Sequence, residues 1–171
     1  MKKLLLVAMM AFGLAVNAQE TSFGITGGFS NMIVKASANG ISASEGASGF
    51  YVGFFADIKV SEKFNIQPEL AYTASFKNDN SINVITMPIL AKYYVAEDFS
   101  ILAGPMLDLL VDEAADNTNT FGLGLAAGAG YDFTDNLFAT ARYSFGLTNR
   151  VENAAVSTKI DYFQIGLGYR F

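Results

Sequence analysis

Apolar side chains alternate with small or polar ones along most of the chain beyond residue 19. The clearest run covers residues 64–76, where thirteen positions alternate without a break. Successive side chains of a β-strand point to opposite faces, whereas an amphipathic helix needs apolar residues three and four positions apart. The run therefore predicts a strand, and the same alternation predicts seven others, at residues 23–30, 50–60, 85–95, 99–111, 121–133, 137–147 and 162–171.

The connections between these predicted strands alternate in length. Tight turns lie at 61–63, 97–98 and 134–136, and the connections between them are long or strongly polar, at 37–49, 77–81, 112–119 and 148–158. Transmembrane β-barrels have an even number of strands, short periplasmic turns and longer external loops. We therefore predict that both termini lie on the periplasmic side.

The first 18 residues differ from the rest of the chain. Two lysines precede an apolar stretch of 13 residues, Leu4–Val16, and a small residue follows at Ala18. This order is typical of a secretory signal peptide, here cut before Gln19. The apolar stretch is also shorter than the roughly 20 residues of a spanning helix. We assign residues 1–18 to a signal peptide and residues 19–171 to one folded domain.

Hydropathy then narrows the class of protein. The chain is 51% hydrophobic and 16% charged, which is too apolar for a disordered chain. Beyond Ala18, Lys92 and Asp108 interrupt the most apolar segments, so no run reaches the length of a spanning helix. A closed barrel is the remaining way to carry a backbone through lipid. We predict an all-β fold, an eight-stranded antiparallel transmembrane up-and-down β-barrel.

The alternative is a water-soluble barrel of the lipocalin type, with its apolar face inward. The other face would then meet water, although it is rich in glycine and poor in charge, which suits the interior of a narrow barrel better. Aromatic residues also gather at the predicted strand ends, as in the two girdles of a membrane barrel. They are Phe23, Phe64, Tyr93, Phe99, Tyr131, Phe133, Tyr169 and Phe171 at the periplasmic ends, and Phe50, Phe76, Phe121, Phe145 and Phe163 at the external ends.

Composition excludes several classes of chemistry. The chain has no cysteine and no histidine. Disulfides, thiolate or imidazole metal sites and histidine-dependent hydrolases therefore have no residues to use. Without the two lysines of the signal peptide, 9 basic and 16 acidic residues remain, a net charge of −7 that disfavours nucleic acid as a partner. We expect no enzymatic activity, no cofactor and no metal.

Ionisable residues on the predicted inward face form the candidate site. The interior of an eight-stranded barrel is just filled by side chains, so we expect these residues to pair with one another. Four of them fall in mid-strand and are predicted to form a central network: Glu69, Lys92, Asp108 and Arg142. The rest of this face carries Asp57, Lys59, Asp132 and Arg170, of which Asp57 and Asp132 are assigned to the same lumen network.

Three interpretations of this lumen network stay open. It holds the lumen shut, it gates a narrow ion path, or its carboxylates perform acid–base chemistry, for which a filled lumen offers no place for a substrate. The acidic loop residues could bind calcium or an external partner, but they lack a calcium-loop motif and are expected to be solvated loop tips. They are Glu45, Asp79, Asp112, Glu113, Asp116 and Glu152.

The chain also resembles a known family. Its last ten residues, YFQIGLGYRF with Tyr169 and the terminal Phe171, look like the C-terminal strand that outer-membrane barrels present to their insertion machinery. Segments 85–105 and 122–147, with Pro88, are similar to the outer membrane protein β-barrel domain family, the porin-family or PorT-like small barrels of Bacteroidetes. The resemblance implies a small barrel in the cell outer membrane, in contact with lipid and, during biogenesis, with the insertion machinery.

We therefore expect a monomer with a side-chain-filled lumen and a structural or loop-mediated interaction role in the cell envelope. The alternative function is a narrow, low-conductance channel for small solutes or ions. The partner of the loops and membership of a secretion complex stay open.

Overall fold

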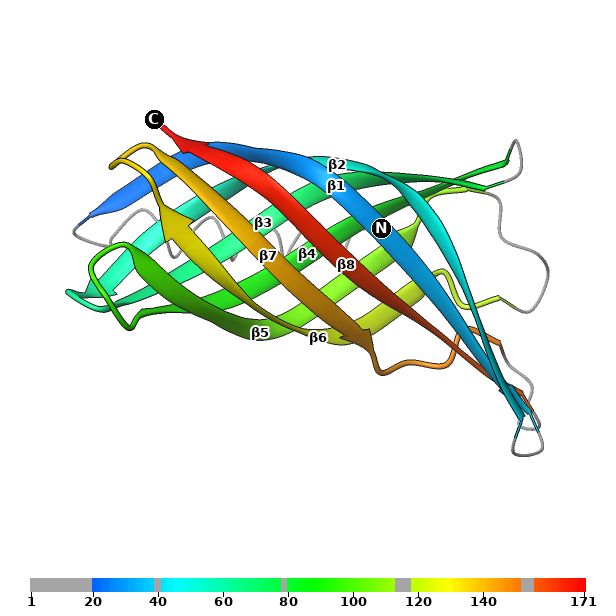
Figure 1. Ribbon diagram of the computed structural model, residues 1–171. Helices are drawn as coiled ribbons and strands as arrows, with labels where there is room; N and C mark the ends of the chain where they lie inside the picture. The colour runs from blue at the N-terminus through cyan, green and yellow to red at the C-terminus, as the bar shows by residue number, and fades with distance from the viewer. Residues whose placement is uncertain (1–19, 39–40, 78–79, 113–117, 152–155) are drawn as a thin grey trace, which may run out of the picture.

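The computed structural model describes residues 20–38, 41–77, 80–112, 118–151 and 156–171, so the predicted signal peptide lies outside the described residues. The described chain forms a closed barrel of antiparallel strands, each paired with its neighbours in sequence, and the last strand pairs with the first (Figure 1). This confirms the predicted eight-stranded antiparallel barrel. The strands are β1 (Thr21–Ala38), β2 (Ile41–Ser61), β3 (Phe64–Lys77), β4 (Asn80–Tyr94), β5 (Phe99–Leu110), β6 (Phe121–Asp132), β7 (Leu137–Gly146) and β8 (Val156–Arg170). In the described part of the chain, no helix is long and apolar enough to cross a membrane.

The strands are staggered around the ring. The register can be followed from Asp132 across all eight strand pairs, and it returns to β6 at Gly122, ten residues away. Strands that close into a barrel must tilt and accumulate such a shear. β1 begins and β8 ends at one end of the barrel, which we call the terminal end, and the β1–β2 hairpin projects at the other, which we call the hairpin end (Figure 1).

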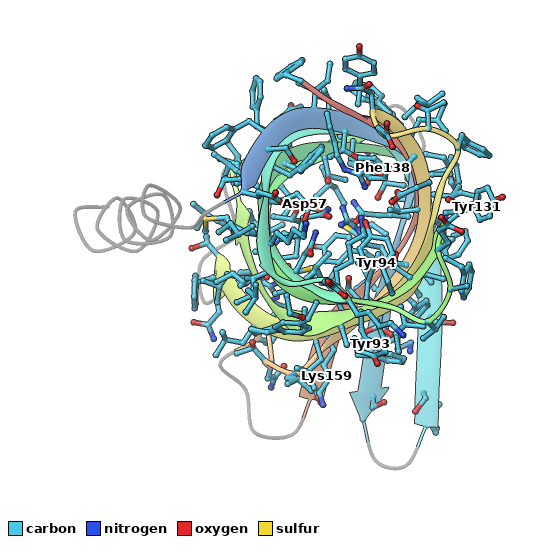
Figure 2. The ribbon with its side chains drawn as sticks, turned by 90° about the vertical axis from the view of Figure 1, so that its left-hand side faces the viewer. Asp57, Tyr93, Tyr94, Tyr131, Phe138 and Lys159 are labelled. Atoms are coloured by element: carbon cyan, nitrogen blue, oxygen red, sulfur yellow. The ribbon has the colours of Figure 1, made fainter. Side chains whose placement is uncertain are left out.

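The alternation of the sequence corresponds to the two faces of the barrel wall. Viewed from the terminal end, Asp57, Tyr94 and Phe138 point into the ring, whereas Tyr93 and Tyr131 point away from it (Figure 2). Large apolar side chains are exposed on the outward face of every strand. This arrangement is inverted relative to a water-soluble protein and suits a lipid environment.

Two features of the predicted strands need correction. Residues 37–49, predicted as a loop, belong mostly to strands, because β1 and β2 stay paired from Asn31 and Ser48 out to Ala38 and Ile41. Small residues in this segment blur the alternation, although their backbone groups pair as well as any others. β8 likewise begins earlier than expected. The hairpin end is therefore extended by paired sheet, with β1, β2 and β8 reaching furthest (Figure 1).

Candidate functional site

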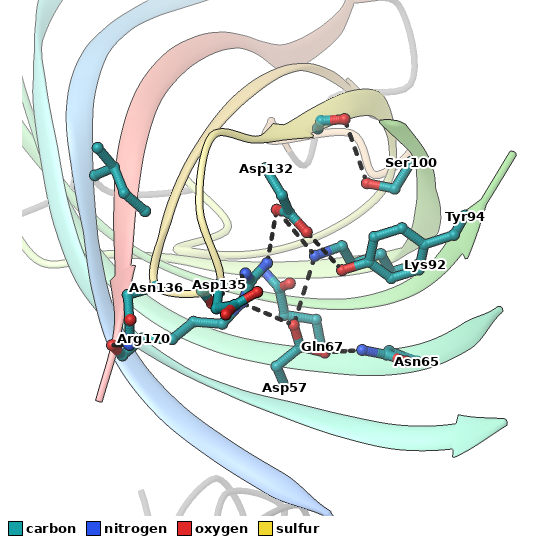
Figure 3. A network of polar contacts seen from close by, with 12 residues as sticks. Asp57, Asn65, Gln67, Lys92, Tyr94, Ser100, Asp132, Asp135, Asn136 and Arg170 are labelled. Atoms are coloured by element: carbon teal, nitrogen blue, oxygen red, sulfur yellow. Dashed lines mark hydrogen bonds and ion pairs between the residues drawn. The ribbon is translucent and has the colours of Figure 1, made fainter. Parts of the chain in front are cut away.

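Among the described residues, the charged side chains of the lumen form three separate groups. The first, which we call the terminal-end cluster, consists of Asp57, Lys92, Asp132 and Arg170 from four different strands (Figure 3). Each carboxylate contacts both cations: the N–O distances from Lys92 Nζ are 3.5 Å to Asp57 and 3.8 Å to Asp132. The corresponding distances from Arg170 are 3.3 Å and 2.8 Å. The two positive charges therefore balance the two negative ones.

Polar and aromatic neighbours hold the terminal-end cluster in place. The hydroxyl of Tyr94 donates a hydrogen bond of 2.8 Å to Asp132, and Asn65 donates one of 2.6 Å to Asp57. Both cations lie over the ring of Phe138, at 4.4 Å for the guanidinium of Arg170 and 5.4 Å for Lys92 Nζ. Such contacts stabilise a cation that has lost much of its hydration.

The terminal-end cluster forms the floor of a cavity that opens at the terminal end. The cavity has a volume of about 1080 Å³, and Asp57, Asp132, Arg170, Asn65 and Tyr94 contribute to its lining. Its rim is mainly acidic, with Glu20, Glu62, Glu97, Asp98 and Asp135 against Lys59 and Lys63. Solvent can therefore reach one side of the terminal-end cluster.

The second group is a buried ion pair, which we call the central pair. Arg142 Nη1 donates to a carboxylate oxygen of Glu69 at 2.6 Å, and both side chains are only 2% exposed. Gln67 donates to the other oxygen of Glu69 at 2.8 Å, and Arg142 Nε donates to Gln164 at 3.0 Å. Each charge thus has one ionic partner and one amide partner, whereas Arg142 Nη2 has no hydrogen-bond partner among the described residues. Such a charge-assisted, buried arrangement specifies one geometry.

The third group, the hairpin-end pair, joins Asp108 to Arg150. Arg150 Nη2 contacts both oxygens of Asp108, and Tyr162 donates to the same carboxylate at 2.7 Å. Arg150 also donates to the carbonyl of Thr120 at 3.1 Å. Gly122 makes room for this pair, since a methyl group at that position would overlap both charged side chains.

A cluster of apolar side chains, which we call the apolar layer, is packed among these polar groups inside the barrel. It consists of buried side chains from six strands: Met32, Ala47, Val84, Leu90, Met106, Ala126, Ile160 and Tyr162. Leu102 and Met106 on β5 are also buried, inward-facing residues. The inner face is therefore partly apolar, which the glycine-rich pattern alone did not indicate.

The structure divides the predicted central network. Glu69 and Arg142 contact each other, whereas Lys92 joins Asp57 and Asp132 at the terminal end and Asp108 pairs with Arg150 at the hairpin end. The physical reason is that the strands are staggered and differ in length, so mid-strand positions do not share one height along the axis. Lys59, also expected inside, is exposed and pairs with Glu20.

Several residues of these groups were missed by reasoning from sequence. Gln67, Gln164 and Tyr162 occupy inward positions of the alternating pattern, so their parity could have identified them. Arg150 follows β7 in a segment predicted as loop, and no periodicity points to it. The predicted insertion-signal residues Tyr169 and Phe171 both face outward and are exposed, and their ring centroids lie 6.1 Å apart.

The acidic residues of the hairpin end have partners of their own where they are described. Glu45 pairs with Lys77 at 2.6 Å. Asn83 donates to Asp112 through its side chain at 2.9 Å and its backbone at 2.6 Å, and these hydrogen bonds hold the pKa of Asp112 below its usual range. Asp79, Glu113, Asp116 and Glu152 lie outside the described residues.

Comparison with known proteins identifies the family. A family model described as outer membrane protein beta-barrel domain matches residues 4–171, and none of the curated proteins matches the sequence.

Among solved structures, the chain is similar to Ail, the attachment invasion locus protein of Yersinia pestis. The identity is 14% over 90% of this chain and 100% of that chain, and the TM-score is 0.55. The same protein in complex with the heparin analogue sucrose octasulfate gives 15% identity, the same coverage and a TM-score of 0.51. Neisserial surface protein A gives 19% identity, again with 90% and 100% coverage, and a TM-score of 0.55. These structures share the fold, and the family match extends over nearly the whole sequence. The chain therefore belongs to the outer membrane protein β-barrel domain family.

Proposed function

We propose that this outer-membrane barrel is a monomer with a closed lumen and that it acts in the envelope through its hairpin end, which faces the outside. The observation that carries the proposal is the filling of the lumen by the buried side chains of the central pair, the apolar layer and the hairpin-end pair. An ion would have to displace a buried ion pair and the closely packed side chains that fill the lumen around it. The lumen charges therefore hold the barrel shut, and the proposal includes no enzymatic activity.

The alternative, a narrow low-conductance channel, is favoured by one observation. The open cavity at the terminal end reaches the terminal-end cluster, and the buried Lys92 Nζ there has no hydrogen-bond partner in the described part of the chain. That cavity would be the entrance of a path gated by the central pair. The apolar layer, which is packed in the same lumen, argues against conduction.

The extended hairpin end supports an interaction role. β2 pairs with β3 only from Ser48 onward, so in the described chain residues 41–47 are paired on the β1 side alone. An edge of this kind can accept an extended segment of another chain. The structural neighbour Ail is named for attachment and invasion and has been solved with a heparin analogue. By analogy, a partner would meet this chain at its hairpin end.

Biogenesis forms a further part of the proposal. Tyr169 and Phe171 end the chain as exposed, outward-facing aromatic residues, and the backbone amide of Phe171 donates to the carbonyl of Phe23 at 2.8 Å. We assign these two side chains to recognition by the barrel-insertion machinery, which would place both termini in the periplasm.

Planar-bilayer recording tests whether the lumen is closed. Refolded residues 19–171 should migrate as a compact barrel on a gel when unboiled and should be silent across many insertions. Leu90→Ala combined with Met106→Ala removes bulk from the apolar layer and should produce brief openings if that layer is the seal. Reproducible single-channel steps from the unaltered chain would instead support the channel and overturn the closed-lumen proposal.

Site-directed labelling tests the orientation. The chain has no cysteine, so an introduced one is unique. Ser44 lies in the projecting part of β2 and Ser61 at the terminal end, and both are exposed. In intact cells, a thiol reagent that cannot cross the outer membrane should label Ser44→Cys and spare Ser61→Cys. The reverse pattern would overturn the orientation without affecting the closed lumen.

A further inference from the structure

Two lysines lie side by side on the outer surface of the barrel, near the hairpin end. Lys35 of β1 and Lys159 of β8 are direct cross-strand partners. Figure 2 places Lys159 outside the ring of strands. Like charges directly opposite each other on a sheet are destabilising unless something compensates them. The pair therefore raises the question of which anion it faces.

One acidic side chain accounts for only part of this charge. Asp161, two residues along β8, contacts Lys35 Nζ and accepts hydrogen bonds from the hydroxyl of Tyr143 at 2.8 Å and the amide of Gly146 at 2.9 Å. Its carboxylate is buried and its oxygens are occupied. Lys159 has no ionic or hydrogen-bond partner among the described residues. A net positive charge remains.

The position of the lysine pair matches the level of lipid headgroups. Along the outward face of β8, the apolar residues Leu167, Ile165 and Phe163 are followed by Asp161 and Lys159. A strand advances about 3.3 Å per residue. Lys159, four residues from Phe163, therefore lies just beyond the end of the apolar band. This is where anionic headgroups attract basic side chains.

The surface beside the lysines is small and polar. On the outward face of β1 and β2, Asn31 donates to Ser48 at 2.9 Å, and the hydroxyls of Ser37 and Ser42 lie 2.8 Å apart. These amide and hydroxyl groups are exposed and can bond to sugar hydroxyls. Beside β4, the exposed polar group at the hairpin end is instead a carboxylate, that of Asp112, which accepts a hydrogen bond from Asn83. Lys77 of β3, another exposed lysine at the hairpin end, is paired with Glu45, so among the described residues the uncompensated positive charge lies on the β8–β1 side.

We propose that Lys35 and Lys159 bind the phosphate of a phosphorylated glycolipid headgroup in the outer leaflet. The ammonium of Lys159, a compact point charge, binds the phosphate. Lys35 contributes a second positive charge while it stays bound to Asp161, and the neighbouring hydroxyls face the sugar. The glycolipid, rather than free phosphate, is the ligand because the lysines lie directly beyond the lipid-facing band. The inference rests on the proposed orientation.

Native mass spectrometry of the refolded barrel in detergent micelles, with lipid A as the probe, tests this site. Lys159→Gln is the variant of choice, since Lys35→Gln would leave Asp161 buried without its cation. We expect it to weaken lipid A binding about fivefold, the effect of one lysine at an anionic headgroup. Lys63→Gln, an exposed lysine at the other end of the barrel, is the matched control and should leave binding unchanged.

Two further probes define the ligand. Lipid A stripped of its phosphates should bind the unaltered barrel as weakly as lipid A binds Lys159→Gln. Equal binding of both lipids, or equal losses for Lys159→Gln and Lys63→Gln, would overturn the proposal. Displacement of lipid A by inorganic phosphate at comparable concentration would overturn the assignment to a lipid. Binding in micelles does not depend on orientation, so failure here is distinguishable from a reversed pattern of thiol labelling.

Discussion

The central pair and the terminal-end cluster are both buried ion pairs in one lumen, but they differ in redundancy. Arg142 has Glu69 as its ionic partner, and both are enclosed. In the terminal-end cluster, each of two carboxylates contacts two cations, and a cavity opens beside them. Removing one member of an isolated buried pair leaves an uncompensated charge, whereas a shared cluster next to solvent can rearrange. Stability should therefore depend most strongly on the centre of the barrel.

The largest effect is expected from Arg142→Met. This change leaves Glu69 charged and enclosed, and breaking a buried pair in this way costs about 3–5 kcal/mol of unfolding free energy. Urea titration of the barrel refolded in lipid vesicles measures the loss. Adding Glu69→Gln to the same variant should restore most of the stability, because the unpaired buried carboxylate is then replaced by a neutral amide. A double variant as unstable as the single one would contradict the assigned pairing.

The apolar layer should come next. Leu90 is fully buried in the lumen, and Leu90→Ala should lower the unfolding free energy by about 2–5 kcal/mol through lost contacts and a cavity. The adjacent Ile89 provides a matched control, because it points outward and is exposed. Ile89→Ala leaves space that lipid can fill, so its effect should be clearly smaller in the same titration. Equal losses at both positions would mean that the layer is not tightly packed.

The terminal-end cluster should tolerate the loss of a cation better than the centre. In Lys92→Met, Arg170 still contacts both Asp57 and Asp132, and water from the cavity can reach Asp132. We expect a loss of about 1–2 kcal/mol, below the range for an enclosed pair. The titration used for Arg142→Met measures it. If Lys92→Met is as destabilising as Arg142→Met, redundancy does not protect the cluster.

The sequence was sufficient for the fold but not for the pairing of the lumen charges. Strict alternation over residues 64–76 predicted a strand and its two faces, and the inward positions of Glu69, Lys92 and Arg142 followed from parity. Partners across the lumen depend on stagger and strand length, which parity does not contain. Arg150 shows the limit most clearly, since it reaches Asp108 from a segment without any regular pattern.

The smallest effect is expected at the exposed ion pairs, which lie at opposite ends of the barrel: Lys59 with Glu20 at the terminal end and Lys77 with Glu45 at the hairpin end. Water already solvates these charges, and salt screens them. Removing one partner therefore leaves the other charge solvated rather than buried. Lys77→Gln should therefore leave the urea midpoint unchanged at low and at high salt, whereas Arg142→Met should shift it at both. The two variants remove the same kind of interaction from the same chain, so the difference between them isolates burial as the cause. A midpoint shift for Lys77→Gln that matches Arg142→Met would show that charge balance, rather than enclosure in the lumen, determines the stability of this barrel.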